Sequence, residues 1–110
     1  PPGMTPAVKF AVRDPGVVDP AHFKVELDNN QVRVLRLHLG KGEKTPIYEE
    51  RLERLLVPLT EARLKTVGAD GALTSAKLRP GEVQWLMPGT QRNENAGDGR
   101  YEAIVVEFKR

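Results

Sequence analysis

The stretch GEKTPIYEERLERLLVPLT, residues 42–60, decides the fold of this chain. It begins at a glycine, passes through a charged segment and ends in a compact apolar run. Residues 49–65 also place several leucines on one helical stripe. Pro58 lies inside that stripe and would remove a backbone hydrogen bond from a helix. The stretch is therefore predicted to be a loop that leads into β-strands.

Short apolar segments separated by turn residues recur along the rest of the chain. The predicted strands are HFKVELD, QVRVLRLHL, ERLLVPL, ARLKTV, ALTSAKL, EVQWLM and YEAIVVEF. Asn29 and Asn30 tolerate positive φ, so they predict a tight hairpin turn between the first two. The spacing indicates an all-β domain, an antiparallel sandwich or barrel of eight to ten short strands.

Alternation along QVRVLRLHL predicts which side of that strand is buried. Leu35, Leu37 and Leu39 lie on one face, and Arg36 and His38 lie on the other. The leucine face is expected to be the core, which leaves His38 exposed. The only other histidine, His22, is expected to be structural or solvated at a strand start.

Composition indicates one small globular domain. The chain has 110 residues, of which 39% are hydrophobic, and no apolar run approaches the roughly 20 residues of a membrane-spanning helix. The net charge is +2, with acids and bases interspersed. A nucleic-acid groove needs a concentrated basic stripe, so neither a membrane nor a nucleic acid is an expected partner.

The two ends of the chain differ in character. Residues 1–20 hold five of the nine prolines and are predicted to form an extended Pro-rich arm, whereas residues 21–110 form the β-domain. The arm segment AVKFAV, residues 7–12, could add an edge strand to a sheet or to a neighbouring subunit. Since the chain begins with Pro1 rather than Met, upstream residues are expected to have been removed or left out. Cytoplasmic and exported locations both stay open, and the absence of cysteine suits either.

Two segments resemble a known family. VRVLRLHLGKGEKTPIYEERLERLLVPLT and LRPGEVQWLMPGTQRNENAGD look like the two motifs of a small single-domain cupin, of the RmlC-like superfamily. The first family motif has a glycine, five residues, His-x-His and then a Glu. The second has a glycine, a Pro-x-Gly turn, a His and, four residues later, an Asn. Here Gly42 and Gly81 open the motifs and Asn95 closes the second. The resemblance implies a jelly-roll barrel (a double-stranded β-helix) from about His22 to Phe108, and a homodimer.

The departures from that pattern concern the metal ligands. Tyr48 and Glu50 stand at the first two family histidines, and Gln91 stands at the third, with Arg92 beside it. Glu53 is the nearest candidate for the family Glu, and Arg54 is the alternative. All three imidazoles are thus predicted to be replaced, which leaves a degenerate site.

A metal is not expected at that site. If one binds, its ligands would be oxygens from Glu50, Glu53 and Gln91, which suit a hard divalent cation. Neutral tyrosine is a weak ligand and glutamine adds no charge. The expectation is therefore a protein without a cofactor, with a divalent cation as the alternative.

Two classes of function remain open. The favoured one is a non-catalytic or weakly catalytic protein that binds a small polar ligand or acts structurally. Candidate ligand contacts are Tyr48, Glu50, Gln91, Arg92 and Trp85.

The alternative is an enzyme on a small polar metabolite, epimerase-, isomerase- or dioxygenase-like. It would use Tyr48 with Glu50 or Glu53 as acid and base, or an oxygen-ligated metal. An enzyme needs a water-filled pocket where Tyr48, Glu50 and Gln91 converge, whereas a structural protein could fill its barrel with side chains such as Trp85, Leu55 and Val57.

Overall fold

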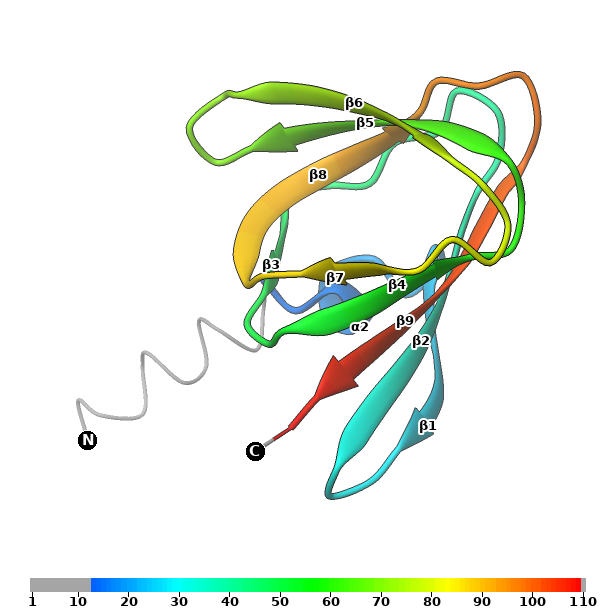
Figure 1. The fold of residues 1–110 in the computed structure, drawn as a ribbon. Helices are drawn as coiled ribbons and strands as arrows, with labels where there is room; N and C mark the ends of the chain where they lie inside the picture. The colour runs from blue at the N-terminus through cyan, green and yellow to red at the C-terminus, as the bar shows by residue number, and fades with distance from the viewer. Residues whose placement is uncertain (1–12, 110) are drawn as a thin grey trace.

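Antiparallel pairing arranges residues 13–109, the part of the chain that the computed structural model describes, into two facing β-sheets (Figure 1). The strands are β1 (Phe23–Asp28), β2 (Val32–Leu39), β3 (Tyr48–Glu50), β4 (Arg54–Pro58), β5 (Ala62–Gly68), β6 (Leu73–Leu78), β7 (Gln84–Leu86), β8 (Gly89–Asn95) and β9 (Tyr101–Phe108). One sheet has the order β1-β2-β9-β4-β7 and the other the order β3-β8-β5-β6. The predicted all-β class and strand number are confirmed, and Pro58 ends β4 instead of interrupting a helix.

The core lies between the two sheets and follows the two-residue period of the strands. On β9, Tyr101, Ala103, Val105 and Glu107 are buried, while the residues between them are half-buried. On β2 the predicted leucine face is buried and His38 lies on the outer face. The apolar core consists of Phe23, Leu35, Leu37, Leu39, Tyr48, Leu56, Ala62, Leu64, Leu78, Tyr101, Ala103 and Val105.

The structure of β4 contradicts one expectation, that Leu55 and Val57 could fill the barrel. Leu56 faces the interior, whereas Leu55 and Val57 lie on the outer face, so they do not fill the barrel. The apolar run of β4 has hydrophobic residues on both faces, and its alternation therefore did not show which set was buried.

Turns in the chain form in two ways, through glycines with positive φ and through a side chain that accepts backbone hydrogen bonds. Gly42 and Gly81, the glycines that open the two motifs, have φ of 76° and 77°, a region that favours glycine. In the β1–β2 hairpin, by contrast, none of the described non-glycine residues has positive φ. There the Asn29 side chain accepts hydrogen bonds from the backbone N–H groups of Gln31 and Val32, at 2.8 and 2.9 Å.

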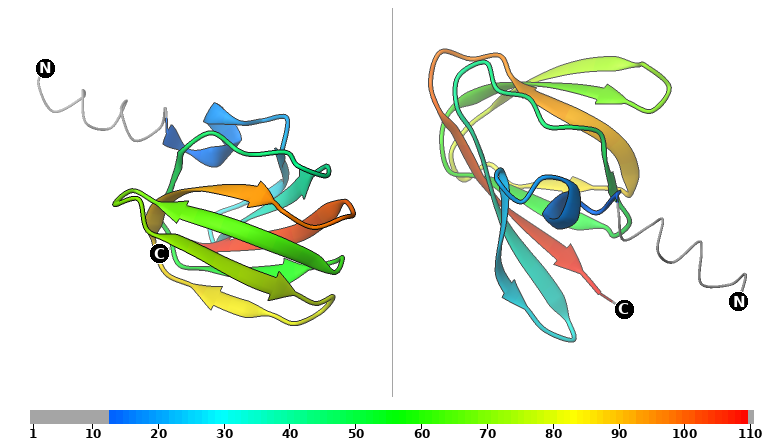
Figure 2. Two further views of the ribbon diagram at one scale, coloured as in Figure 1. Left: turned by 90° about the horizontal axis from the view of Figure 1, so that it is seen from above. Right: turned by 180° about the vertical axis from the view of Figure 1, so that it is seen from behind.

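A short helix, α2 (Pro15–Val18), lies within the segment that was predicted to be extended. Asp14 caps it by accepting a hydrogen bond from the N–H of Gly16. The helix contacts β1 and β3, the edge strands of the two sheets (Figure 2). It therefore covers one side of the sandwich. The proposed strand at residues 7–12 lies outside the described residues, and no helix within residues 13–109 is long and apolar enough to cross a membrane.

Asn95, which closes the second motif, has a structural role. Its side-chain nitrogen lies 3.1, 3.2 and 2.8 Å from the carbonyl oxygens of Leu39, Gly40 and Gly99. Its Oδ1 accepts a hydrogen bond from the N–H of Gly97. One buried amide thus ties the loop after β2 to the loop between β8 and β9.

We predict that Asn95→Ala lowers the free energy of unfolding by roughly 2–4 kcal/mol, because it leaves several buried backbone groups without a partner. Chemical denaturation measures this loss. The matched control is Asn30→Ala in the exposed hairpin turn, which should change stability by less than about 0.5 kcal/mol. Equal stability of the two variants would contradict the structural role of Asn95.

Candidate functional site

Pairing of β3 with β8 brings the two motifs together. Tyr48 lies directly opposite Gln91, and the Gln91 side-chain nitrogen donates a hydrogen bond of 3.1 Å to the Tyr48 hydroxyl. Asn93 follows Gln91 by one strand period, and its side-chain nitrogen donates to the same hydroxyl. The Asn93 Oδ1 in turn accepts a hydrogen bond of 3.1 Å from the hydroxyl of Thr66 on β5. The Tyr48 oxygen therefore accepts two hydrogen bonds.

These residues line a cavity of about 270 Å³ between the sheets. The predicted residues Tyr48, Glu50 and Gln91 all lie in its wall. The other lining residues are Phe23, Leu37, Arg54, Leu56, Leu64, Thr66, Thr74, Ala76, Leu78, Gln84, Leu86, Met87, Asn93, Tyr101 and Val105. Thr74, Ala76 and Met87 are exposed, so the cavity reaches the surface between β6 and β7. This side lies opposite to the one that α2 covers.

The cavity contains both tyrosines of the chain. Burial raises the pKa of Tyr48 to about 12, and the hydrogen bonds from the Gln91 and Asn93 amides offset only part of that effect. Burial also raises the pKa of Tyr101, and the proximity of Tyr48 raises it further. Among residues 13–109, the buried Tyr101 hydroxyl has no hydrogen-bond partner. Both side chains are therefore neutral phenols at physiological pH.

Two buried carboxyl groups lie side by side, Glu50 in the cavity wall and Glu107 next to it, outside the lining. Burial raises the pKa of Glu50 well above its usual range, and a hydrogen bond to Glu107 raises it further. The nearby guanidinium groups of Arg54 and Arg33 lower the Glu50 pKa only in part. We therefore assign one proton, held by Glu50, to this pair at neutral pH.

Arg33 joins the carboxyl pair to the N-terminal segment. Its guanidinium donates hydrogen bonds of 2.6 and 3.1 Å to Glu107, and of 2.9 and 2.6 Å to Asp14. Burial alone would lower the pKa of Arg33, but the hydrogen bonds to these two carboxylates outweigh it and raise the pKa. A continuous chain of hydrogen-bonded groups thus runs from Asp14 beside α2 through Arg33 and Glu107 to Glu50 in the cavity wall.

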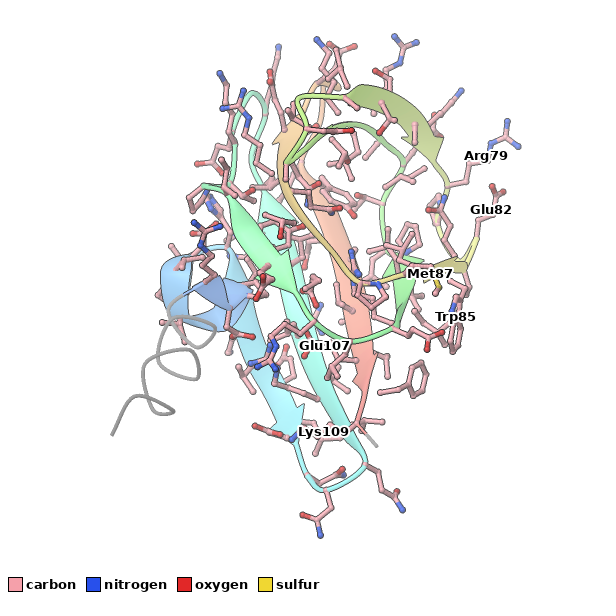
Figure 3. All side chains as sticks on the ribbon, turned by 90° about the vertical axis from the view of Figure 1, so that its left-hand side faces the viewer. Arg79, Glu82, Trp85, Met87, Glu107 and Lys109 are labelled. Atoms are coloured by element: carbon pink, nitrogen blue, oxygen red, sulfur yellow. The ribbon has the colours of Figure 1, made fainter. Side chains whose placement is uncertain are left out.

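The other predicted site residues do not join this cavity. Trp85 is 54% exposed on the outer side of β7, where it stacks on Phe108 and donates a hydrogen bond of 3.0 Å to Glu53 (Figure 3). Arg92 is exposed on the face of β8 opposite to Gln91. Side chains alternate along a strand, so adjacent residues point to opposite faces. Arg92 therefore cannot share a face with Gln91, and Glu53 cannot share one with Arg54.

Four residues in or beside this site were not identified from the sequence as ligand contacts. Arg54 was only the alternative to Glu53, and the register of β4 places Arg54 inside. Asn93 could have been found from the strand period, since it follows Gln91 by two residues. Tyr101 begins a predicted strand, and its sequence position left open whether it packs in the core or lines a pocket. Glu107 carried no local signal, because only the pairing of β9 places it beside the others.

Neither histidine of the chain lies in the cavity wall. His22 lies between Asp19 and Glu43, with ring nitrogens 2.9 and 3.4 Å from their carboxyl oxygens. His38 is half-buried on the outer face of β2, and its ring contacts that of His22 edge to face.

Solved structures of other proteins have a fold similar to that of this chain. A cupin domain from Bordetella pertussis has a TM-score of 0.75 and 21% identity, over 80% of this chain and 92% of that one. The cupin fold is present here. An RmlC-like cupin family protein from Methanocaldococcus jannaschii has a TM-score of 0.64 and 15% identity, over 79% and 78% of the two chains. An uncharacterised Klebsiella pneumoniae protein with a double-stranded β-helix domain has a TM-score of 0.64 and 16% identity, over 78% and 70%.

These similarities establish the cupin fold, and they leave the activity open because one fold hosts many chemistries. No protein-family model matches the chain, and a search of curated proteins finds no significant match.

The donor atoms of this cupin cavity do not fit the metal ion that the fold family implies. A protein site that holds a divalent cation is usually built around ionised carboxylates, neutral imidazoles or thiolates. Here Tyr48 is a neutral phenol that already accepts two hydrogen bonds, and Glu50 holds a proton. Glu53, the third proposed oxygen ligand, lies outside the cavity. Within residues 13–109 no group of three or more His, Cys, Asp or Glu side chains is placed to hold a metal.

We predict that the free energy of unfolding falls as pH rises from about 5 to 8, by up to about 1.4 kcal/mol per pH unit from Glu50 alone. The folded protein keeps a proton that the unfolded chain releases above about pH 4.3. The stabilisation is therefore full below that pH and is lost as pH rises through the folded-state pKa of Glu50. Glu50→Gln should flatten this dependence, because the amide carries no such proton and still donates to Glu107.

Denaturation curves at a series of pH values measure the effect. The matched control, Asp98→Asn, removes an exposed carboxylate and should leave the pH dependence parallel to that of the wild type. Parallel curves for Glu50→Gln and the wild type would show that Glu50 does not hold the proton.

Proposed function

We propose that this cupin-fold domain binds a small polar molecule in its cavity without a metal ion. The single observation that carries the proposal is the convergence of Tyr48, Gln91 and Asn93 on one hydroxyl inside a cavity that reaches the surface. Tyr48, Glu50 and Gln91 stand where the cupin motifs would supply histidines. The proposal therefore includes the loss of the metal site.

The size and lining of the cavity support a small ligand. A volume of about 270 Å³ is slightly below the usual range of ligand pockets, about 300–1,000 Å³. Polar groups gather around Tyr48, and the remaining wall is mostly apolar and includes five leucines. Such an arrangement, apolar with a few convergent polar groups, is typical of sites that orient a small molecule.

Proton-transfer catalysis is the second candidate. The observation that favours it is that Glu50 and Tyr48 lie on one cavity wall, where Tyr48 would act as the acid and Glu50, once it has lost its proton, as the base. Glu53 has no part in this alternative because it lies outside the cavity. A metal-dependent, dioxygenase-like reaction is not supported by the donor atoms present.

The two tyrosines allow a direct test of the binding proposal. Both line the cavity, whereas the only tryptophan lies outside it. In a protein labelled with 3-fluorotyrosine and 5-fluorotryptophan, we expect small hydroxy acids, diols and amides to shift the tyrosine ¹⁹F signals and to leave the tryptophan signal unchanged. Ala76→Trp should abolish the shifts, because Ala76 is an exposed residue at the opening of the cavity.

Manganese provides a second arm of this experiment. A bound Mn²⁺ ion would broaden both tyrosine signals strongly, and we expect no such broadening. A variant with histidine at positions 48, 50 and 91 is the positive control, because it restores the imidazole ligands of the motif. Stoichiometric Mn²⁺ binding by the wild type, or the absence of any compound that shifts the tyrosine signals, would contradict the proposal.

We also propose that the chain associates with a second copy of itself through the outer face of the five-stranded sheet. Strand register aligns one apolar row across its full width: Leu27, Val34, Val106, Leu55 and Trp85. The two ends of this row are about half exposed, and Trp85 marks one of them in Figure 3. Arg79 and Glu82, of opposite charge, project near that end, so a two-fold axis could pair each with the other residue of the second copy.

We predict that Val106→Lys shifts the protein from dimer to monomer in sedimentation velocity, because it places a charge at the centre of the row. Ser75→Lys, an equal change on an exposed position of β6, should leave the dimer intact. A wild-type protein that sediments as a monomer throughout the micromolar range would overturn this self-association.

A further inference from the structure

The hydrogen-bonding capacity of the cavity wall restricts the chemistry of what can bind there. A phenolic oxygen has one O–H to donate and two lone pairs to accept with. The lone pairs of Tyr48 are used by the amide groups of Gln91 and Asn93. Asn93 Oδ1 lies within hydrogen-bonding distance of both the Thr66 hydroxyl and the Gln91 amide. What remains available at Tyr48 is its O–H, a donor.

Tyr101 adds a second donor at the same place. Its hydroxyl is buried in the cavity wall and has no partner among residues 13–109. An unpaired buried hydroxyl costs free energy, so a native protein rarely keeps one without a reason. Tyr101 lines the same cavity as Tyr48, and the proximity of Tyr48 raises the pKa of Tyr101. Both phenols line one cavity, so the O–H groups of both are candidate donors to one acceptor.

The cavity wall carries a positive charge near the two tyrosines, on Arg54. Glu50 is the only carboxyl group of the described residues within 4.0 Å of the Arg54 guanidinium, and Glu50 holds a proton in its hydrogen bond to Glu107. Glu107 is itself paired with Arg33. Arg54 donates one hydrogen bond, to the carbonyl of Met87, and a guanidinium has five N–H groups. Arg54 also lowers the pKa of Tyr48, which places its charge near the phenols.

We propose that the cavity takes a small monocarboxylate, whose oxygens accept hydrogen bonds from Tyr48 and Tyr101 beside Arg54 and whose compact apolar body lies among the leucines. This inference rests on the proposed ligand-binding function and names its ligand class. The carboxylate supplies the acceptor atoms and the negative charge that the wall lacks. Leu56, Leu64 and Leu86 supply an apolar surface that a phosphate or sulfate ion would leave uncovered.

Benzoate, benzamide and inorganic phosphate are suitable probes. The first two have nearly the same shape and differ in charge, and phosphate has the charge without the apolar body. In calorimetric and ¹⁹F titrations of the full chain we expect benzoate to bind at least about ten-fold more tightly than benzamide, as a charge-assisted hydrogen bond implies. Phosphate should not shift the fluorotyrosine signals.

Tyr101→Phe is the decisive variant because it removes only a hydroxyl that lacks a partner within residues 13–109. We expect it to weaken benzoate binding about ten-fold or more and to leave thermal stability unchanged or higher. Phe23→Leu is the matched control, since it changes an aromatic wall residue without removing a polar group. It should preserve the preference for benzoate over benzamide.

The outcomes separate this inference from the function on which it rests. If benzamide or a diol binds as tightly as benzoate, or if Tyr101→Phe binds benzoate as well as the wild type, the monocarboxylate class is wrong and ligand binding stands. If none of the probes or of the wider compound panel shifts the tyrosine signals, both proposals fail.

Discussion

The ion pair between Arg33 and Glu107 is the interaction on which the charge arrangement of this protein depends. Glu107 is the last inward residue of β9, at the centre of the five-stranded sheet, and it is 2% exposed. A buried carboxylate is costly unless it is paired and hydrogen-bonded. Arg33 supplies two bonds to it, and Asp14 balances the other side of the guanidinium. With Glu107 already paired, Glu50 is most stable when it keeps a proton, and Arg54 is left as the positive charge of the cavity.

This network also attaches the N-terminal segment of the described chain to the β-sandwich. Asp14 both caps α2 and binds Arg33, so the segment before β1 is attached to the barrel by a charged contact as well as by packing. The helix covers the side where β1 and β3 are edge strands, and the cavity reaches the surface on the side of β6 and β7. A ligand would therefore enter from the open side and meet the polar wall formed by β3, β8 and β9.

Much of the fold was predictable because two-residue alternation is visible wherever polar and apolar residues take turns. Leu35, Leu37 and Leu39 were assigned to the core on this ground, and their burial confirms it. Alternation was uninformative in β4, where Leu55, Leu56 and Val57 are all apolar. Asn29 was predicted to sit in a turn, but through a positive φ, whereas its side chain makes the turn by accepting backbone hydrogen bonds. Residue preference identified the turn, and only the geometry showed its mechanism.

The sequence by itself determined the all-β class, the turns and the motif positions Tyr48, Glu50 and Gln91, because each depends on residues close together in the chain. Only the tertiary structure decided which side chains surround them. Tyr101 lies more than fifty residues beyond Tyr48 and lines the same cavity, and Glu107 lies more than fifty residues beyond Glu50, to which it is hydrogen-bonded. Trp85 faces outward for the same reason, since the register of β7 against β4 sets its side. Local patterns reveal the period of a strand, but which strands pair, and in which register, depends on burial summed over the whole chain.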